Sequence, residues 1–487
     1  MTLLAPGCTV AGVPSEELEE KWSKFTSEGL QVDESSLGGI GLFYNCAGQQ
    51  QCEQDPIVLR VPVEQTYNLA TCMEILDELK ATGEKDYKII LSLLSTLEPE
   101  TETVILICYV VGLVYISNRG DQVSESVRQI VSKHGTYLKV LSNTFTIDYP
   151  KAMKESDDLP DPVIDCLFKN AQKVKLLYDL IEKDAVLDTE YMTFEQFYQL
   201  VQAVSSRVLE VPEEVEKNGD DFYVSPTLVP LLDFANHSFA PNAYFDLDRQ
   251  ANCVVLKLDK DKIPSTATRF EVTISYSSER QLGPFLSTYG FVPTIDLEAP
   301  EGFTVDIPTS FWQPEDNLKR KWLGVPSKVQ IVRNGANGTY SIQYPDLLML
   351  VFDKDLHLNP KWPAYITKLL KDDYLPEDIE HVIEDIKTDQ KHNDIIQNNG
   401  NLCGLMYGDN GEVMTMEMAY EIHSSKSAQL QVISDKEILN ILKQYCSQLK
   451  HELSANTGGS SQDPRSFESL VLQYRNAVMT NLNSIIN

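Results

Sequence analysis

The sequence predicts an α+β protein whose β-structure is split along the chain. Extended segments appear over residues 35–63, a mostly helical pattern covers 65–210, strands return from Leu228, and a largely helical pattern follows residue 300. Strands and helices do not alternate regularly, so a doubly wound nucleotide-binding fold is not expected. The chain has 487 residues. This length exceeds one compact core, so about two to four domains or subdomains are predicted.

A glycine-rich turn opens the first extended region. The stretch "SSLGGIGLFYN" places Gly38, Gly39 and Gly41 where the backbone could approach a ligand closely, although a tight turn without a ligand is the plainer interpretation. It is not a dinucleotide-binding fingerprint, because Tyr44 stands where a third glycine is required. The next stretch, "PIVLRVPV", reads as a short strand bounded by two prolines.

The region 65–210 contains one apolar helix and one amphipathic helix. The run "VILICYVVGLVYI" is too short to span a membrane and predicts a buried core helix. Further on, Thr193 and Gln196 form a capping-box signature, and Arg207 falls at the end of the helix that follows. The apolar residues on one face of that helix are Phe197, Leu200, Val201, Val204 and Val208.

Strand patterns resume after residues 211–221, an acidic stretch that reads as a loop. The apolar run "LLDFA" predicts a buried strand that ends in the polar triplet "NHS". The segments "NAYFDLD" and "CVVLKL" predict a hairpin across "RQAN". The segment "FEVTISY" alternates with the period of a half-buried strand and ends in Tyr276.

The stretch "TIDLEAPEG", residues 294–302, is the predicted domain boundary. Beyond it the pattern is largely helical. Two amphipathic helices are expected near the C-terminus, separated by the polar tract "SANTGGSSQDP".

Composition excludes several classes of function. The chain has 41 Lys and Arg against 72 Asp and Glu, a formal net charge of −31, so direct binding of nucleic acid is not expected. Such a surface could attract basic protein segments. The nine cysteines form no CxxC pair, so no zinc or redox motif is predicted and a reducing compartment is favoured. The N-terminus lacks the features of a secretory signal, and no membrane contact is expected.

Four candidate site residues stand out chemically: Asn236, His237, Tyr276 and Tyr289. The Asn236 amide and the His237 ring could hold a charged ligand through several hydrogen bonds. Alternatively, the triplet could be a local turn in which polar side chains bond the backbone. Each tyrosine taken alone is best explained as a core aromatic residue.

A series of short motifs resembles the SET-domain protein methyltransferases. In order along the chain, the motifs are GxGLF, a helix ending in SSR, "LVPLLDFANHS" followed by "PNA", "ISY" and "YGF". They are most similar to the branch related to the Rubisco large-subunit lysine methyltransferase and to fungal ribosomal and elongation-factor lysine methyltransferases. Specific motifs support the resemblance over residues 25–295, and helical character alone supports it over 300–487. Cysteine clusters typical of many histone-modifying members are absent.

The resemblance implies small antiparallel sheets with knot-like threading over 25–295, a helical insertion over 65–210 and a helical substrate-binding domain over 300–487. It implies S-adenosyl-L-methionine (AdoMet) as co-substrate and no metal. The implied cofactor-binding residues are Gly39, Ile40, Gly41, Leu42, Arg207, Asp233, Asn236, His237, Tyr276 and Tyr289. Tyr276 is also the implied catalytic residue. Several relatives carry an acidic residue where this chain has Gly38, which leaves the contacts there open.

The implied function is AdoMet-dependent lysine N-methylation of a non-histone protein, with a basic component of the translation machinery, a ribosomal protein or elongation factor, as the expected partner. A histidine N-methyltransferase of the same fold and an inactive SET-like binding protein are the alternatives. Tyr289 favours lysine over histidine, because relatives that modify histidine lack this tyrosine. A monomer in the cytoplasm, and in the nucleus as well, is expected.

Overall fold

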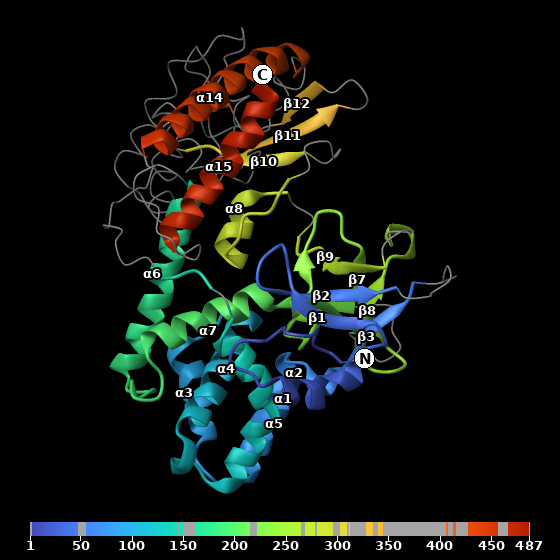
Figure 1. Ribbon diagram of the computed structural model, residues 1–487. Helices are drawn as coiled ribbons and strands as arrows, with labels where there is room; N and C mark the ends of the chain where they lie inside the picture. The colour runs from blue at the N-terminus through green and yellow to red at the C-terminus, as the bar shows by residue number, and fades with distance from the viewer. Residues whose placement is uncertain are drawn as a thin grey trace.

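The computed structural model describes residues 2–46, 55–144, 146–149, 162–214, 222–263, 268–277, 280–295, 302–308, 311, 328–334, 339–343, 406–407, 413–414, 427–455 and 466–486. Figure 1 shows three parts: small sheets at the right, a group of helices below, and a C-terminal part above. This mixture of helices and small, mainly antiparallel sheets confirms the predicted α+β class.

The sheet beside the glycine turn is built from four distant segments. Its strands, in spatial order, are β1 (Leu30–Glu34), β2 (Ile40–Asn45), β9 (Arg269–Ile274) and β6 (Asn236–His237). Adjacent strands are antiparallel, except that β6 runs parallel to β9. This order brings the predicted "NHS" triplet next to the end of the strand that precedes Tyr276.

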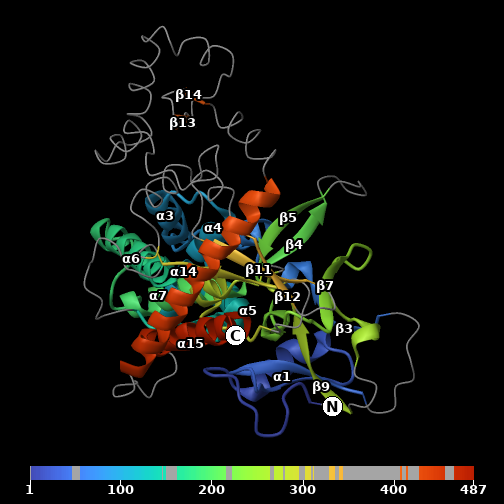
Figure 2. The ribbon, with the colours of Figure 1, turned by 90° about the horizontal axis from the view of Figure 1, so that it is seen from above.

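Two further small sheets complete the predicted SET region. One has the strand order β3 (Ile57–Pro62), β8 (Cys253–Leu258) and β7 (Ala243–Asp248), and it contains the predicted hairpin. The other pairs β4 (Leu209–Glu214) with β5 (Phe222–Thr227). Figure 2 shows this pair beside β7.

Three local predictions were wrong. The segment predicted as a loop begins with β4, whose Val211 is buried and pairs with Ser225, so cross-strand packing outweighs its acidic composition. The buried run before Asn236 is a helical turn over Leu232–Phe234 rather than a strand. Strand β9 ends at Ile274, so Tyr276 lies two residues beyond the sheet.

Among the described residues, seven helices lie around the N-terminal sheets, and the predicted insertion supplies six of them. They are α1 (Ser15–Trp22), α2 (Leu69–Ala81), α3 (Tyr87–Leu97), α4 (Glu102–Asn118), α5 (Glu125–Ser142), α6 (Pro162–Lys183) and α7 (Phe194–Arg207). Helix α4 is buried over Leu106–Ile116, as its apolar sequence predicts, because other helices pack around it. The capping box of Thr193 and Gln196 starts α7 and is confirmed.

The C-terminal part is not helical throughout. Its described elements are β10 (Phe303–Asp306), β11 (Lys328–Asn334), β12 (Thr339–Gln343), β13 (Met406–Tyr407), β14 (Val413–Met414), α14 (Ser427–Ala455) and α15 (Phe467–Ile486). Strands β10–β12 form an antiparallel sheet that buries Val329 and Ile331, two residues apart on β11. This alternation is the strand signal that the helical prediction overlooked.

A second hydrophobic core crosses the predicted domain boundary. It joins Tyr445 of α14 and Tyr474 of α15 to Leu167 of α6 and to Leu286. Leu286 belongs to a short helical stretch in which α8 (Leu282–Pro284) continues as a π-helical turn over Phe285–Tyr289. The C-terminal part therefore packs directly on the segment that carries Tyr289. Most of the predicted boundary itself, residues 296–301, lies outside the described residues.

Within the part of the chain that the structure describes, no helix combines the length and apolarity needed to cross a bilayer.

Candidate functional site

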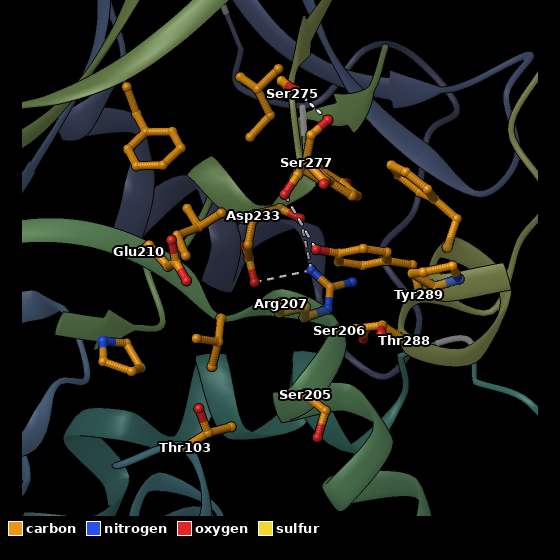
Figure 3. A pocket seen from close by; sticks show the side chains of 18 residues that line it. Thr103, Ser205, Ser206, Arg207, Glu210, Asp233, Ser275, Ser277, Thr288 and Tyr289 are labelled. Atoms are coloured by element: carbon orange, nitrogen blue, oxygen red, sulfur yellow. Dashed lines mark hydrogen bonds and ion pairs between the residues drawn. The ribbon is translucent and has the colours of Figure 1, made fainter. Parts of the chain in front are cut away.

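Two cavities meet at one group of side chains. A cavity of 930 Å³, here called the glycine-turn cavity, is lined by Gly39, Ile40 and Asn236 among others. A cavity of 630 Å³, here called the hairpin cavity, lies against β4 and β5 (Figure 3). The residues that line both cavities are Ser206, Arg207, Asp233, Tyr276 and Tyr289. Ligands held in the two cavities would therefore meet at these side chains.

The structure brings most of the predicted site residues together. Seven of the ten line one or both cavities, and the other three are Gly41, Leu42 and His237. Leu42 is fully buried in the main core, and His237 is buried behind Tyr276. Which of these residues contact a cofactor stays a prediction.

A buried ion pair forms the floor shared by the cavities. Arg207 Nη1 donates to Asp233 Oδ2 at 3.0 Å and to the Asp233 carbonyl at 3.1 Å. Arg207 Nε donates to Thr144 Oγ1 at 3.0 Å, and Tyr137 donates to Asp233 Oδ2 at 2.7 Å. Burial raises the pKa of Asp233, while Arg207 and the Tyr137 hydroxyl oppose this shift. Among the described residues Arg207 Nη2 has no acceptor, so this group is available to an anionic ligand.

The Tyr276 hydroxyl and backbone are held by separate partners. The hydroxyl donates to the Ala235 carbonyl at 2.8 Å, and the backbone N–H donates to His237 Nδ1 at 3.1 Å. The Tyr289 ring lies 4.8 Å from the Tyr276 ring, centroid to centroid. Burial raises the pKa of Tyr276 well above its usual value of about 10. The hydroxyl is therefore protonated near neutral pH, in keeping with the hydrogen bond that it donates to Ala235.

His237 acts through its side chain on Tyr276. Because a backbone N–H can only donate, Nδ1 is the acceptor and the neutral ring carries its hydrogen on Nε2. Nε2 is buried without a hydrogen-bond partner among the described residues, and the ring packs against Phe239 and Phe285. Burial, with a smaller contribution from Arg280, lowers the pKa of His237 to about 4. The resemblance implied only a cofactor contact for this residue.

Sequence reasoning missed several polar residues at the site. Tyr137 and Thr144 contact the ion pair from the helical insertion, and Glu210 lines the hairpin cavity. Glu271 of β9 accepts from Asn236 Nδ2 at 2.7 Å. The only available signal for Glu271 was its place in an alternating strand, on the face opposite to the apolar Val272. Figure 3 shows Arg207 directed toward Asp233, with Glu210 and Tyr289 on opposite sides of the cavity.

Two cavities that share a buried ion pair and two tyrosines define a protein able to hold two ligands in contact, as a group-transfer enzyme must. The family model of cytochrome c lysine N-methyltransferase 1 matches residues 18–483, and the chain belongs to this family.

Curated relatives named cytochrome c lysine N-methyltransferase 1 include two yeast proteins. The protein from Kluyveromyces lactis is 29% identical over 293 residues, which cover 56% of this chain and 55% of the relative. The protein from Saccharomyces cerevisiae is 29% identical over 304 residues, covering 58% and 49%. SET domain-containing protein 8 of Schizosaccharomyces pombe is 32% identical over 120 residues, covering 23% of this chain and 25% of the relative. The chain thus spans about half the length of the Kluyveromyces lactis and Saccharomyces cerevisiae relatives.

Among solved structures, the SET domain of LSMT bound to MeLysine and AdoHcy aligns with a TM-score of 0.43 and 13% sequence identity. This alignment covers 97% of this chain and 90% of that one.

Proposed function

We propose that this chain is an AdoMet-dependent protein-lysine N-methyltransferase whose substrate is cytochrome c. The observation that carries the proposal is the meeting of two cavities at Arg207, Asp233, Tyr276 and Tyr289 in a member of this family. The names of the relatives support cytochrome c as the substrate. They give no support to the ribosomal protein or elongation factor expected from the sequence.

The glycine-turn cavity fits the amino-acid end of AdoMet. Arg207 Nη2 would bind the carboxylate, since no described residue accepts from it. Gly41 leaves room for the Asn236 side chain, because an added Cβ would lie 2.9 Å from Asn236 Nδ2. Bound AdoMet supplies an activated methyl group on a sulfonium centre. The chain's own contribution is to hold and orient the two reactants.

The hairpin cavity fits a lysine side chain. Its lining combines the Phe285 and Tyr289 rings with neutral hydroxyl groups, and Glu210 lies at its exposed edge. The five hydroxyl groups that line only this cavity and are labelled in Figure 3 belong to Thr103, Ser205, Ser275, Ser277 and Thr288. Together these groups would accept a long apolar stem and guide an ammonium group toward Tyr276.

The amine must lose its proton before it can attack. A free lysine has a pKa of about 10.4, so burial beside the Arg207 cation would favour its neutral form. Asp233 is committed to Arg207 and Tyr137, and Tyr276 stays protonated. Neither is therefore the base; the Tyr276 hydroxyl and nearby carbonyls instead orient the amine.

The proposal extends to the predicted domains and the compartment. Residues 25–295 would bind AdoMet and the target lysine, and residues 300–487 would contribute to binding the substrate protein. A reducing compartment such as the cytoplasm is proposed because the nine cysteines are scattered, without CxxC spacing, which does not suggest a disulfide framework.

The test is to incubate the protein with labelled AdoMet and cytochrome c and to identify the modified residue by mass spectrometry. Label on a cytochrome c lysine is expected. Label on histidine would favour the alternative enzyme, and failure to bind S-adenosylhomocysteine (AdoHcy) in calorimetry would favour the inactive binding protein.

A further inference from the structure

Glu271 projects from β9 onto the back of the glycine turn. Its Oε1 accepts hydrogen bonds from Asn236 Nδ2 and from Ser35 Oγ, each at 2.7 Å. A Cβ added to Gly41 would lie 2.5 Å from the same oxygen. Two segments that are remote in sequence, the glycine turn and the segment of Asn236, therefore close on one carboxylate oxygen. Glu271 lines neither cavity, so it lies behind Asn236 as seen from the glycine-turn cavity.

The partners of Asn236 determine how its amide is oriented. Besides Glu271, Asn236 Nδ2 reaches the Ile40 carbonyl at 3.2 Å. A carboxylate and a carbonyl can only accept, so the NH₂ group must face both of them. The oxygen Oδ1 is then on the other side of the amide, and no donor from the described residues bonds it. Because Asn236 lines the glycine-turn cavity, the free hydrogen-bonding capacity that it offers there is that of an acceptor.

The cavity therefore offers one donor and one acceptor of definite position. Arg207 Nη2 can donate to an anion, and Asn236 Oδ1 can accept from a cation or another N–H donor. This pair matches the α-carboxylate and α-ammonium of an amino acid. We propose that Glu271 is a positioning residue, which locks the Asn236 amide so that Oδ1 accepts a hydrogen bond from the α-ammonium of AdoMet. This inference rests on the proposed function.

A carboxylate suits this role better than other side chains. One ionised oxygen can accept from Asn236 and Ser35 at the same time, and charge-assisted bonds of this kind are about twice as strong as neutral ones. Glu271→Gln keeps an accepting oxygen at nearly the same place. Glu271→Ala removes the acceptor and leaves the Asn236 amide free to turn over.

The test compares AdoHcy with the analogue in which hydrogen replaces the α-amino group, using calorimetry to obtain Kd for both. In the wild type AdoHcy should bind about tenfold or more tightly than the analogue, as one hydrogen bond to a charged group implies. In Glu271→Ala this ratio should fall to within about twofold of unity, because the amide no longer presents Oδ1 to the ammonium. In Glu271→Gln it should stay within about threefold of the wild-type ratio, because an accepting oxygen remains.

Asp248→Ala is the matched control, because Asp248 is a strand carboxylate that pairs with Arg60 and lines neither cavity. It should leave both Kd values unchanged. If the wild-type ratio persists in Glu271→Ala while AdoHcy still binds, the positioning role is overturned and the proposed function survives. If Glu271→Ala does not fold, Asn236→Ala decides, since an unchanged ratio there also overturns the role. Failure of the wild type to bind AdoHcy overturns both proposals.

Discussion

At the scale of single residues, Tyr276 is held by two different contacts that can be broken separately. Its hydroxyl donates to the Ala235 carbonyl, and its backbone N–H donates to His237. One contact positions the oxygen and the other positions the chain. The ring itself packs against Tyr289 and His237. Removing the hydroxyl should therefore leave the ring and backbone in place.

Tyr276→Phe tests whether that hydroxyl orients the reactants. Turnover should fall on the order of a hundredfold, as for loss of one preorganised polar group. Stability should fall by only about 1 kcal/mol, since one carbonyl loses its partner, and Kd for AdoHcy should hardly change. Steady-state kinetics, calorimetry and thermal unfolding measure the three quantities. A folded mutant with more than about a third of wild-type turnover would show that the hydroxyl has no such role.

His237 predicts a pH dependence of stability. Burial lowers its pKa to about 4 in the folded chain, whereas an exposed histidine has a pKa of about 6.5. Between these values the unfolded chain binds a proton that the folded chain excludes, so stability should decrease as the pH falls through this window. This ring can contribute at most about 1.4 kcal/mol per pH unit.

The contribution of His237 to the pH dependence of stability can be measured by urea unfolding of the wild type and of His237→Asn between about pH 6.5 and 5. The amide introduced by this substitution keeps an oxygen that can accept from the Tyr276 N–H, and it cannot be protonated in this range. The variant should lose less stability than the wild type as the pH falls. His134, whose pKa burial also lowers to about 4, stays in both proteins and contributes equally. If the stability of the two proteins fell equally with pH, the pH dependence could not be assigned to His237.

The site residues that carry sequence motifs could be predicted, and their supporting residues could not. Asn236, Tyr276 and Tyr289 lie in recognisable short motifs and do line the cavities. The contact between Glu271 and Ser35 joins residues 236 positions apart. No periodicity encodes such a contact, because it exists only after β2 and β9 have paired in a particular register.

At the scale of elements, the glycine turn depends on a missing side chain. Gly41→Ala would place a Cβ 2.5 Å from Glu271 Oε1 and 2.9 Å from Asn236 Nδ2, so both side chains must move. AdoHcy affinity should fall about tenfold or more if Asn236 bonds the ligand. Gly135→Ala is the control, because its added Cβ meets nothing within 4 Å on helix α5. It should keep the affinity and gain about 0.5–1 kcal/mol of stability. Equal affinities in both variants would contradict this account of the turn.

The C-terminal helices and the segment that carries Tyr289 share a core. Leu449 of α14 is 1% exposed and belongs to the same cluster as Leu282 and Leu286. Leu449→Ala should cost about 2–5 kcal/mol of stability. Hydrogen exchange over 282–289 should also accelerate, because these residues lose their packing partner when the C-terminal core loosens. Unchanged exchange there would mean that the two parts open independently.

Element prediction succeeded where the signal was local. Helix α4 and the start of α7 follow from an apolar run and a capping box within a few residues. It failed for β4 and for β10–β12, where pairing with another strand decides the structure. It also failed at Leu232–Phe234, because a buried apolar run does not by itself distinguish a strand from a helical turn.

At the scale of the whole molecule, charge and site point to the same kind of partner. The net charge of −31 disfavours polyanions and favours proteins that present lysine. Glu210 is exposed at the edge of the hairpin cavity, and its charge contributes to raising the pKa of Tyr289, after burial. Under the proposed function, this carboxylate would attract the ammonium group of a lysine that enters the hairpin cavity.

Glu210→Gln separates this local attraction from the overall charge. At low ionic strength kcat/KM for the protein substrate should fall about two- to fivefold, mainly through KM, because an entering lysine loses one attractive carboxylate. Added salt should shrink the difference, since charges more than about 10 Å apart are screened at 0.1 M. Asp77→Asn, on α2, makes the same change in net charge at a side chain that is 72% exposed and lines neither cavity. It should leave kcat/KM nearly unchanged, so an equal fall in both variants would show that only the net charge of the molecule attracts the substrate.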